Sequence, residues 1–207
     1  MAIEVQQIDP EYPQTRLIRH AKEVLERGGI VIYPTDTIYG LGADIRSRPA
    51  LERILKIKKA SNQKLLSFIL PDFSDIADWA HMPTSAYRLM KRVVPGKYTF
   101  VLPASKMVPD TLLQKRSTVG IRIPDAPVAL RLAAELGRPL LSTSVPLGGD
   151  GFYTDPGEMA KQFALDVDLI LDAGILANVP STIIDFTSGS PVILRHGAGD
   201  TSLFEGA

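Results

Sequence analysis

Three short segments rich in hydroxyl side chains are the first places in this sequence where a small anion could bind. They are Pro34-Thr35-Asp36-Thr37, Ser142-Thr143-Ser144 and Pro180-Ser181-Thr182, and each adjoins an apolar run that is expected to form a strand. Backbone N–H groups and hydroxyls at such positions donate hydrogen bonds to phosphate or carboxylate oxygens. Ser, Thr, Asp and Pro are also ordinary turn residues, so each segment on its own is more simply explained as a turn.

Two arginines stand in apolar surroundings. Arg122 lies inside the run Val119–Ile123, and Arg195 directly follows Val192-Ile193-Leu194. A buried guanidinium without a partner is costly, so each of these arginines needs an anion beside it. That anion is either an internal Asp or Glu or the phosphate or carboxylate of a ligand, and the sequence favours neither.

Basic residues gather in the middle of the chain. Of the 23 Lys and Arg residues, 15 lie in residues 46–122, which hold only 5 Asp and Glu. Four lysines lie close together there: Lys56, Lys58, Lys59 and Lys64. Lysines are common at helix ends and on solvated helix faces. The alternative is a lysine-bearing loop that faces a triphosphate, and the asymmetry of charge favours some anionic partner.

Several common sites are excluded. The chain has no Cys, which rules out disulfides and thiolate metal sites, and His20, His81 and His196 lack the spacing of metal ligands. It contains no Walker A, G-x-G-x-x-G or G-x-S-x-G pattern. With no apolar run of about 18 residues and no signal-like start, we expect no membrane association and a cytoplasmic location.

The elements that must position these residues follow from apolar periodicity. Helices are predicted at residues 15–27, 48–59, 84–94, 125–136 and 155–163. Asp125 is the expected N-cap of the fourth helix, and glycines follow the first and the fourth. Strands are predicted at residues 3–8, 30–33, 65–70, 98–102, 119–123, 140–143, 169–171, 182–186 and 192–194. Mixed strands and helices predict an α/β or α+β fold, in one domain over residues 1–207.

Residues 33–44, Tyr-Pro-Thr-Asp-Thr-Ile-Tyr-Gly-Leu-Gly-Ala-Asp, resemble the signature of the YrdC-domain family. Four more segments resemble that family in its order and roughly its spacing: Val119–Pro124, Ser142–Ser144, Ser181–Asp185 and Ile193–Gly197. Together the resemblance spans Ile30 to Gly197, nearly the whole chain, and it is strongest to the stand-alone YciO branch.

The resemblance implies a twisted mixed sheet flanked by helices around a basic concave cavity. Members of the family make threonylcarbamoyl-AMP from L-threonine, bicarbonate and ATP, and release pyrophosphate; the product feeds a modification of tRNA. ATP would therefore be a substrate accompanied by Mg²⁺, with L-threonine as the second substrate. Members have also been linked to double-stranded RNA and tRNA, which implies RNA as a further partner.

The resemblance also implies roles for individual residues, and it implies no metal ligand among them. The catalytic group would be Lys58, Arg122 and Ser144. The threonine pocket would be formed by Thr35, Tyr39 and Ser181. The nucleotide would be contacted by Lys64, Thr118, Thr154 and Arg195.

Two positions depart from the family pattern. Where the family has K-x-R-P, Lys58 is followed by Ala60 in place of the arginine, and where it has S-x-N, Ser144 is followed by Pro146. Proline offers no N–H and no polar side chain. Each charge-assisted contact contributes about 1.5–3 kcal/mol, so losing two would slow synthesis roughly a hundred- to ten-thousand-fold.

Three hypotheses therefore stay open. The chain is a threonylcarbamoyl-AMP synthase-like enzyme with weak activity, an RNA-binding protein that has lost efficient synthesis, or a diverged enzyme that hydrolyses a carbamoyl-adenylate.

Overall fold

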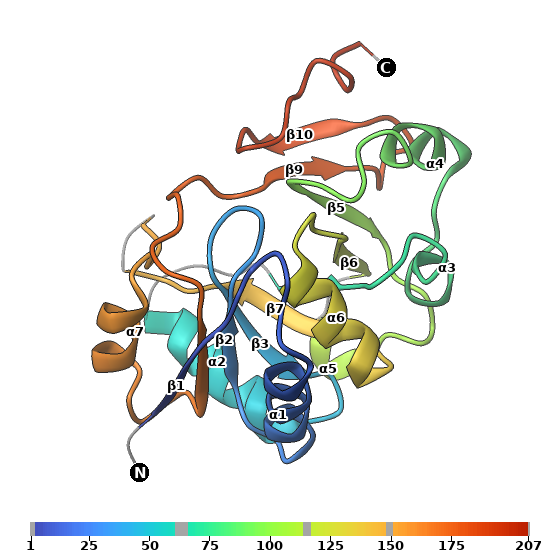
Figure 1. Ribbon diagram of the computed structural model, residues 1–207. Helices are drawn as coiled ribbons and strands as arrows, with labels where there is room; N and C mark the ends of the chain where they lie inside the picture. Colours follow the sequence, from blue (N-terminus) through green and yellow to red (C-terminus); the bar gives the residue numbers. More distant parts are fainter. Residues whose placement is uncertain (1–2, 61–65, 114–116, 148–150, 207) are drawn as a thin grey trace.

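The computed structural model describes residues 3–60, 66–113, 117–147 and 151–206, with the backbone alone at residues 59 and 60 (Figure 1). Its centre is a mixed sheet of 10 strands in the order β1-β8-β2-β3-β7-β4-β6-β5-β9-β10. The strands are β1 (Glu4–Gln7), β2 (Val31–Tyr33), β3 (Gly40–Asp44), β4 (Ser67–Ile69), β5 (Tyr98–Pro103), β6 (Thr118–Arg122), β7 (Leu140–Ser144), β8 (Leu169–Asp172), β9 (Thr182–Asp185) and β10 (Val192–Arg195).

The helices are α1 (Thr15–Glu26), α2 (Arg48–Ala60), α3 (Ile76–Trp79), α4 (Thr84–Met90), α5 (Asp110–Leu113), α6 (Pro127–Leu136) and α7 (Pro156–Gln162). The sheet contains both parallel and antiparallel pairs: β4 runs parallel to β6, whereas β7 pairs antiparallel with both β3 and β4. The expectation of a mixed α/β fold with one large sheet is confirmed. No helix among the described residues is long and apolar enough to cross a membrane.

Two apolar cores lie on opposite faces of the sheet, because alternate residues of a strand point to opposite faces. Helices α1 and α6 pack against each other and cover one face, which receives Tyr33 and Leu140. Helix α2 covers the other face, which receives Ile32 and Leu141. Packing on both faces fixes the register of each strand against its neighbours. The positions of the residues at the strand ends are fixed as a result.

Helix boundaries follow local rules, with one correction. Gly28, at φ 81°, ends α1, and Gly137, at φ 66°, ends α6 in the left-handed region that glycine tolerates best. The expectation that Asp125 caps the fourth helix is wrong. That helix begins at Pro127 with Ala126 as its N-cap, and no side chain caps it. The Asp125 N–H instead donates to the Asp36 carboxylate at 3.0 Å.

Strand β3 has no counterpart among the predicted strands. Its sequence, Gly-Leu-Gly-Ala-Asp, is poor in the β-branched and aromatic residues that favour strands. The structure explains the two glycines: a Cβ at Gly40 or Gly42 would lie 2.7 Å from the ring of Tyr33 on β2. The Tyr33 ring therefore lies flat across β3, and its hydroxyl donates to Ser142 Oγ on β7 at 2.5 Å.

Candidate functional site

A cavity of about 450 Å³ opens where the ends of several strands meet. Eight of the residues predicted for the site line it: Thr35, Tyr39, Lys58, Thr118, Arg122, Ser144, Ser181 and Arg195. They come from segments spread from residue 35 to residue 195, so the sheet brings together side chains that are distant in sequence. Lys64 lies outside the described residues. Thr154 is described but is not among the lining residues; its carbonyl oxygen accepts the Leu176 N–H at 3.3 Å.

Arg122 is held at the end of β6 by the loop that follows β2. Its Nη2 donates to Thr37 Oγ1 at 2.7 Å and to Thr35 Oγ1 at 3.4 Å, and it forms a short ion pair with Asp36. Arg122 is only 8% exposed. Its Nε is buried and has no hydrogen-bond partner among the described residues. The Asp36 carboxylate thus compensates the charge of Arg122. One N–H donor of the guanidinium, at Nε, is not used by any described residue.

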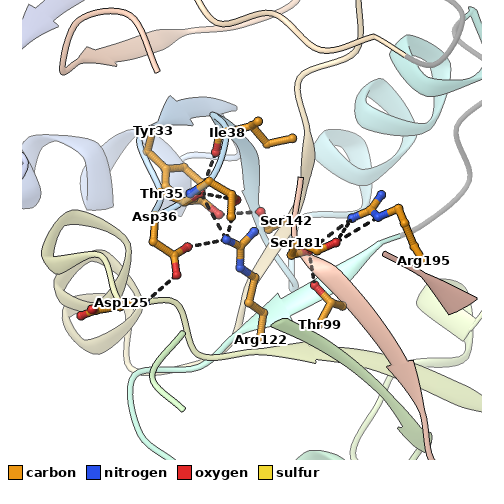
Figure 2. A network of polar contacts seen from close by, with 11 residues as sticks. Tyr33, Thr35, Asp36, Ile38, Thr99, Arg122, Asp125, Ser142, Ser181 and Arg195 are labelled. Atoms are coloured by element: carbon orange, nitrogen blue, oxygen red, sulfur yellow. Dashed lines mark hydrogen bonds and ion pairs between the residues drawn. The ribbon is translucent and has the colours of Figure 1, made fainter. Parts of the chain in front are cut away.

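Arg195 approaches from the edge strand β10, and its hydrogen bonds with the described residues go to Ser181, with no carboxylate among its partners. Its Nε and Nη2 donate to the backbone carbonyl of Ser181 at 3.0 and 2.8 Å, and Nη2 also reaches Ser181 Oγ at 3.2 Å. The Thr99 and Ser181 hydroxyls lie 2.8 Å apart and so fix each other. Figure 2 shows the Arg122 guanidinium between the Thr35–Asp36 loop on one side and Ser181 with Arg195 on the other.

The two guanidinium groups affect each other electrostatically. Burial, and after it the positive charge of Arg122, lowers the pKa of Arg195 from its ordinary value. Arg195 stays protonated at ordinary pH, but its charge is less well stabilised here than in water. An anion between the two arginines would relieve both causes, because it would supply hydrogen bonds and cancel the repulsion.

Lys58 brings a third cation to the cavity from α2. The side chain is buried, at 4% exposed, and its Nζ donates to Thr143 Oγ1 on β7 at 2.6 Å. Ser144, at the end of the same strand, also lines the cavity and is partly exposed. Lys58 therefore adds a basic side chain to the lining of the cavity.

Tyr39 shapes the floor of the cavity. Its hydroxyl donates to the Gly174 carbonyl at 2.7 Å and accepts the Ala173 N–H at 3.0 Å, so it ties β3 to the segment that follows β8. Burial raises the pKa of Tyr39 to about 12, and the phenol therefore stays neutral at ordinary pH. A neutral hydroxyl that makes two hydrogen bonds with the backbone holds this part of the cavity in place and does not act as an acid or base.

The charged side chains among the described lining residues of the cavity are all basic. Lys58, Arg122 and Arg195 line it, and no Asp or Glu is among the described lining residues. Nor do the described residues form any group of three or more His, Cys, Asp or Glu that could hold a metal. Proteins usually hold Mg²⁺ through carboxylates and substrate phosphates. The cavity lining itself therefore does not offer an all-protein Mg²⁺ site, and it fits an anionic ligand.

Sequence reasoning missed two parts of the site. One is an apolar wall lined by Val101, Val108, Leu112, Leu113, Val119 and Phe152, part of which lies on α5 and the segment before it. That short helix has too few residues to produce a periodic pattern. The other part is the hydrogen-bond partners of the predicted residues, namely Asp36, Thr99 and Thr143, of which Thr99 and Thr143 also line the cavity. Asp36 and Thr143 stood in the hydroxyl-rich segments, so composition pointed to them without showing their contacts.

Comparison with known proteins gives consistent results. Residues 23–197 match the family model Sua5_yciO_yrdC, which is described as telomere recombination. YciO of Escherichia coli is 42% identical over 199 residues, covering 95% of this chain and 97% of its own length. Its crystal structure superposes with a TM-score of 0.93, at 40% identity over 98% of this chain and 99% of the other.

Two comparisons concern proteins named for an activity or a ligand. The threonylcarbamoyl-AMP synthase of Vibrio vulnificus is 32% identical over 184 residues, which cover 87% of this chain and 98% of that protein. The crystal structure of Pyrococcus abyssi Sua5 complexed with L-threonine has a TM-score of 0.85 and 32% identity. That match covers 93% of this chain and 57% of Sua5.

Proposed function

The chain belongs to the Sua5/YciO/YrdC family, and from that premise we propose that it binds L-threonine and ATP in this cavity and forms threonylcarbamoyl-AMP. The observation that carries the proposal is the convergence of Lys58, Arg122 and Arg195 on one cavity without a lining carboxylate among the described residues. The carboxylate of a zwitterionic amino acid and the oxygens of a polyphosphate would supply the negative charge that such a cavity lacks. The synthase homologue and the threonine-bound Sua5 structure support the same assignment.

The proposed roles divide the cavity between the two substrates. Arg122, which lines the cavity, takes the threonine carboxylate. Thr35, Tyr39 and Ser181 complete the amino-acid end. Arg195, Lys58 and Thr118 face the nucleotide, with Lys64 and Thr154 as further nucleotide contacts that stay predictions. Ser144 lies between the two ends.

The chemistry needs positioning and charge neutralisation more than a side-chain nucleophile. Bicarbonate and the threonine amine condense to a carbamate with loss of water. A carbamate oxygen then attacks the α-phosphorus of ATP, the bond to the β-phosphate oxygen breaks, and pyrophosphate leaves. The protein holds the carbamate in line and stabilises the charge that develops on the phosphate oxygens. A Mg²⁺ ion would arrive with the nucleotide phosphates.

The test is release of pyrophosphate from ATP by the purified protein, with threonine and bicarbonate supplied together and each omitted in turn. Pyrophosphate that depends on both supports synthesis. Calorimetric titration with ATP and with threonine tests binding separately from turnover. A protein that binds neither ligand contradicts the proposal. If the protein only accelerates the decay of supplied threonylcarbamoyl-AMP relative to buffer, the hydrolytic alternative replaces synthesis.

RNA binding is a second candidate, and a specific feature favours it. Residues 79–109 contain five Lys and Arg and no Asp or Glu. Within this stretch Arg88, Lys91 and Arg92 lie on and just after α4, at a spacing that shares one helix face, and all three are exposed. Such a face fits a phosphate backbone. Affinity for tRNA that falls steeply with salt, and falls further when the three are changed to Glu, supports it; unchanged affinity removes it.

A further inference from the structure

The ion pair behind Arg122 is the feature of the site that the proposed roles do not use. Asp36 lies in the loop after β2, and its side chain is only 5% exposed. It is not among the residues that line the cavity. Figure 2 places it on the side of Arg122 away from Ser181 and Arg195. Asp36 therefore reaches a ligand only through Arg122.

Both carboxylate oxygens of Asp36 are engaged. Oδ1 accepts Nη2 of Arg122, and Oδ2 accepts the backbone N–H of Asp125 at 3.0 Å. Because Asp125 precedes α6, the carboxylate is tied to the backbone on that side and cannot follow a movement of Arg122 without losing a hydrogen bond. Thr37 adds a third tie, with its Oγ1 2.7 Å from the same Nη2.

All hydrogen bonds that the Arg122 side chain makes with described residues go through Nη2. One nitrogen of the fork thus has three oxygen partners, whereas the buried Nε has none among the described residues. A guanidinium is planar and rigid, so fixing Nη2 fixes the direction of the remaining N–H groups. The arrangement therefore fixes in advance the direction in which Arg122 meets a ligand carboxylate in the cavity.

We propose that Asp36, assisted by Thr37, is a positioning residue that presents Arg122 to the carboxylate of the amino-acid substrate and selects that substrate. The inference rests on the proposed binding of threonine and ATP. It also assigns a second effect to Asp36: its negative charge offsets that of Arg122, so Arg122 contributes less to the attraction of the nucleotide phosphates. Asp36 therefore supports amino-acid binding and does not support phosphate binding.

The test compares two ligands on one variant. Asp36→Asn removes the charge and loosens Arg122, so threonine affinity is expected to fall about tenfold or more, as for loss of a charge-assisted hydrogen bond. Affinity for ATP is expected to stay the same or to rise, because one negative charge near the cavity has gone. Calorimetric titration of each ligand measures both. A general loss of structure would weaken both ligands together, so opposite responses separate positioning from a merely structural role.

Asp125→Asn is the matched control. It removes the same charge from the adjoining, exposed position, whose carboxylate takes no part in the described contacts of Arg122. Threonine affinity should stay within about twofold of the wild type. If Asp36→Asn does not fold, Thr37→Val carries the test, because it removes one neutral acceptor of Nη2 and leaves the ion pair in place. A selective loss of threonine binding, at least about threefold, is then expected.

The outcomes are distinguishable. If the wild-type protein binds neither threonine nor ATP, the proposed function fails and the role of Asp36 fails with it. If the wild-type protein binds both, and Asp36→Asn or Thr37→Val weakens the two ligands equally or not at all, the positioning role is overturned while the proposed function stands.

Discussion

The backbone carbonyl of Ser181 accepts two hydrogen bonds from Arg195, from Nε at 3.0 Å and from Nη2 at 2.8 Å. The protein thus orients this guanidinium with a neutral group and does not cancel its charge. Arg122, in contrast, is paired with Asp36. The two arginines of the cavity therefore differ in the charge they offer a ligand, although both are fixed in direction.

Replacing Arg195 with lysine tests whether the orientation of its guanidinium contributes to nucleotide binding. Lys keeps the charge but cannot donate both hydrogen bonds to Ser181 and still face a phosphate. We expect ATP affinity to fall about tenfold or more, because a charge-assisted hydrogen bond contributes about 1.5–3 kcal/mol. Calorimetric titration with ATP measures the change. Arg88→Lys, on the exposed face of α4, should leave it unaltered. Equal affinities for Arg195→Lys and the wild type would show that Arg195 does not contact the nucleotide.

The departures at residues 60 and 146 make a prediction about rate. Ala60→Arg combined with Pro146→Asn is expected to raise threonine-dependent pyrophosphate release by roughly a hundredfold or more, since each restores a donor worth about 1.5–3 kcal/mol. Pro146 pairs with Phe152 in an isolated antiparallel β-bridge, and Phe152 lines the cavity, so position 146 is close to the site. The single variants should each give part of the gain. No increase in the double variant would mean that other residues limit the rate.

The contact between Tyr33 and the glycines of β3 predicts a cost for enlarging either glycine. In Gly42→Ala the new Cβ would lie 2.7 Å from Cε1 of Tyr33, and overpacking of this kind costs about 1–3 kcal/mol of the free energy of unfolding. Urea unfolding measures the loss. In a Tyr33→Leu background the same substitution should cost less than in the wild type. Identical costs in the two backgrounds would mean that Tyr33 is not the obstacle.

The ion pair between Asp44 and Arg138 predicts a pH dependence of stability. Burial alone would raise the pKa of the Asp44 carboxyl, but hydrogen bonds from Arg138 and the Arg46 N–H outweigh it and hold the pKa below 3.8. The native state therefore favours the ionised carboxylate. The stability it contributes is present above the unfolded-state pKa and is lost as pH falls through the lower folded-state value.

Asp44→Asn leaves Arg138 only the longer ion pair with Glu26, at 3.7 Å, so we expect a loss of about 1.5–3 kcal/mol in the free energy of unfolding at pH 6. The difference from the wild type should narrow as pH falls below 4, where the wild type loses the same interaction. Urea unfolding across this range measures it. Glu52→Gln, which breaks the exposed pair with Arg48, should change stability by less than about 1 kcal/mol at either pH. A pH-independent difference for Asp44→Asn would contradict the assignment.

The sequence indicated those parts of the site that depend on local pattern. Arg122 is predicted inside a strand and Arg195 directly after one, because apolar runs adjoin them, and the structure places them at the ends of β6 and β10, respectively. The demand of Arg122 for an anion also followed from its surroundings. Which anion it would be did not follow, because Asp36 is 86 residues away and only the sheet brings the two together.

Other features could not be predicted because their cause is tertiary. Strand β3 is poor in residues that favour strands, and it forms a strand between β2 and β7 because its glycines leave room for Tyr33. The part of the apolar wall that lies on α5, Leu112 and Leu113, belongs to a helix of four residues, too few for a period to be detected. Asp125 has the residue type of a helix cap, yet its backbone serves Asp36 instead.

The cavity takes its walls from the loop after β2, from α2, from β6 and from the edge strand β10. No contiguous fragment of the polypeptide holds a complete set of these groups, so recognition emerges only once both halves of the sheet have assembled. An anion bound there would contact groups from both halves of the sheet, so its binding would stabilise the folded protein. Fraying of β10 would withdraw Arg195 from that anion, so a looser edge strand would bind it more weakly.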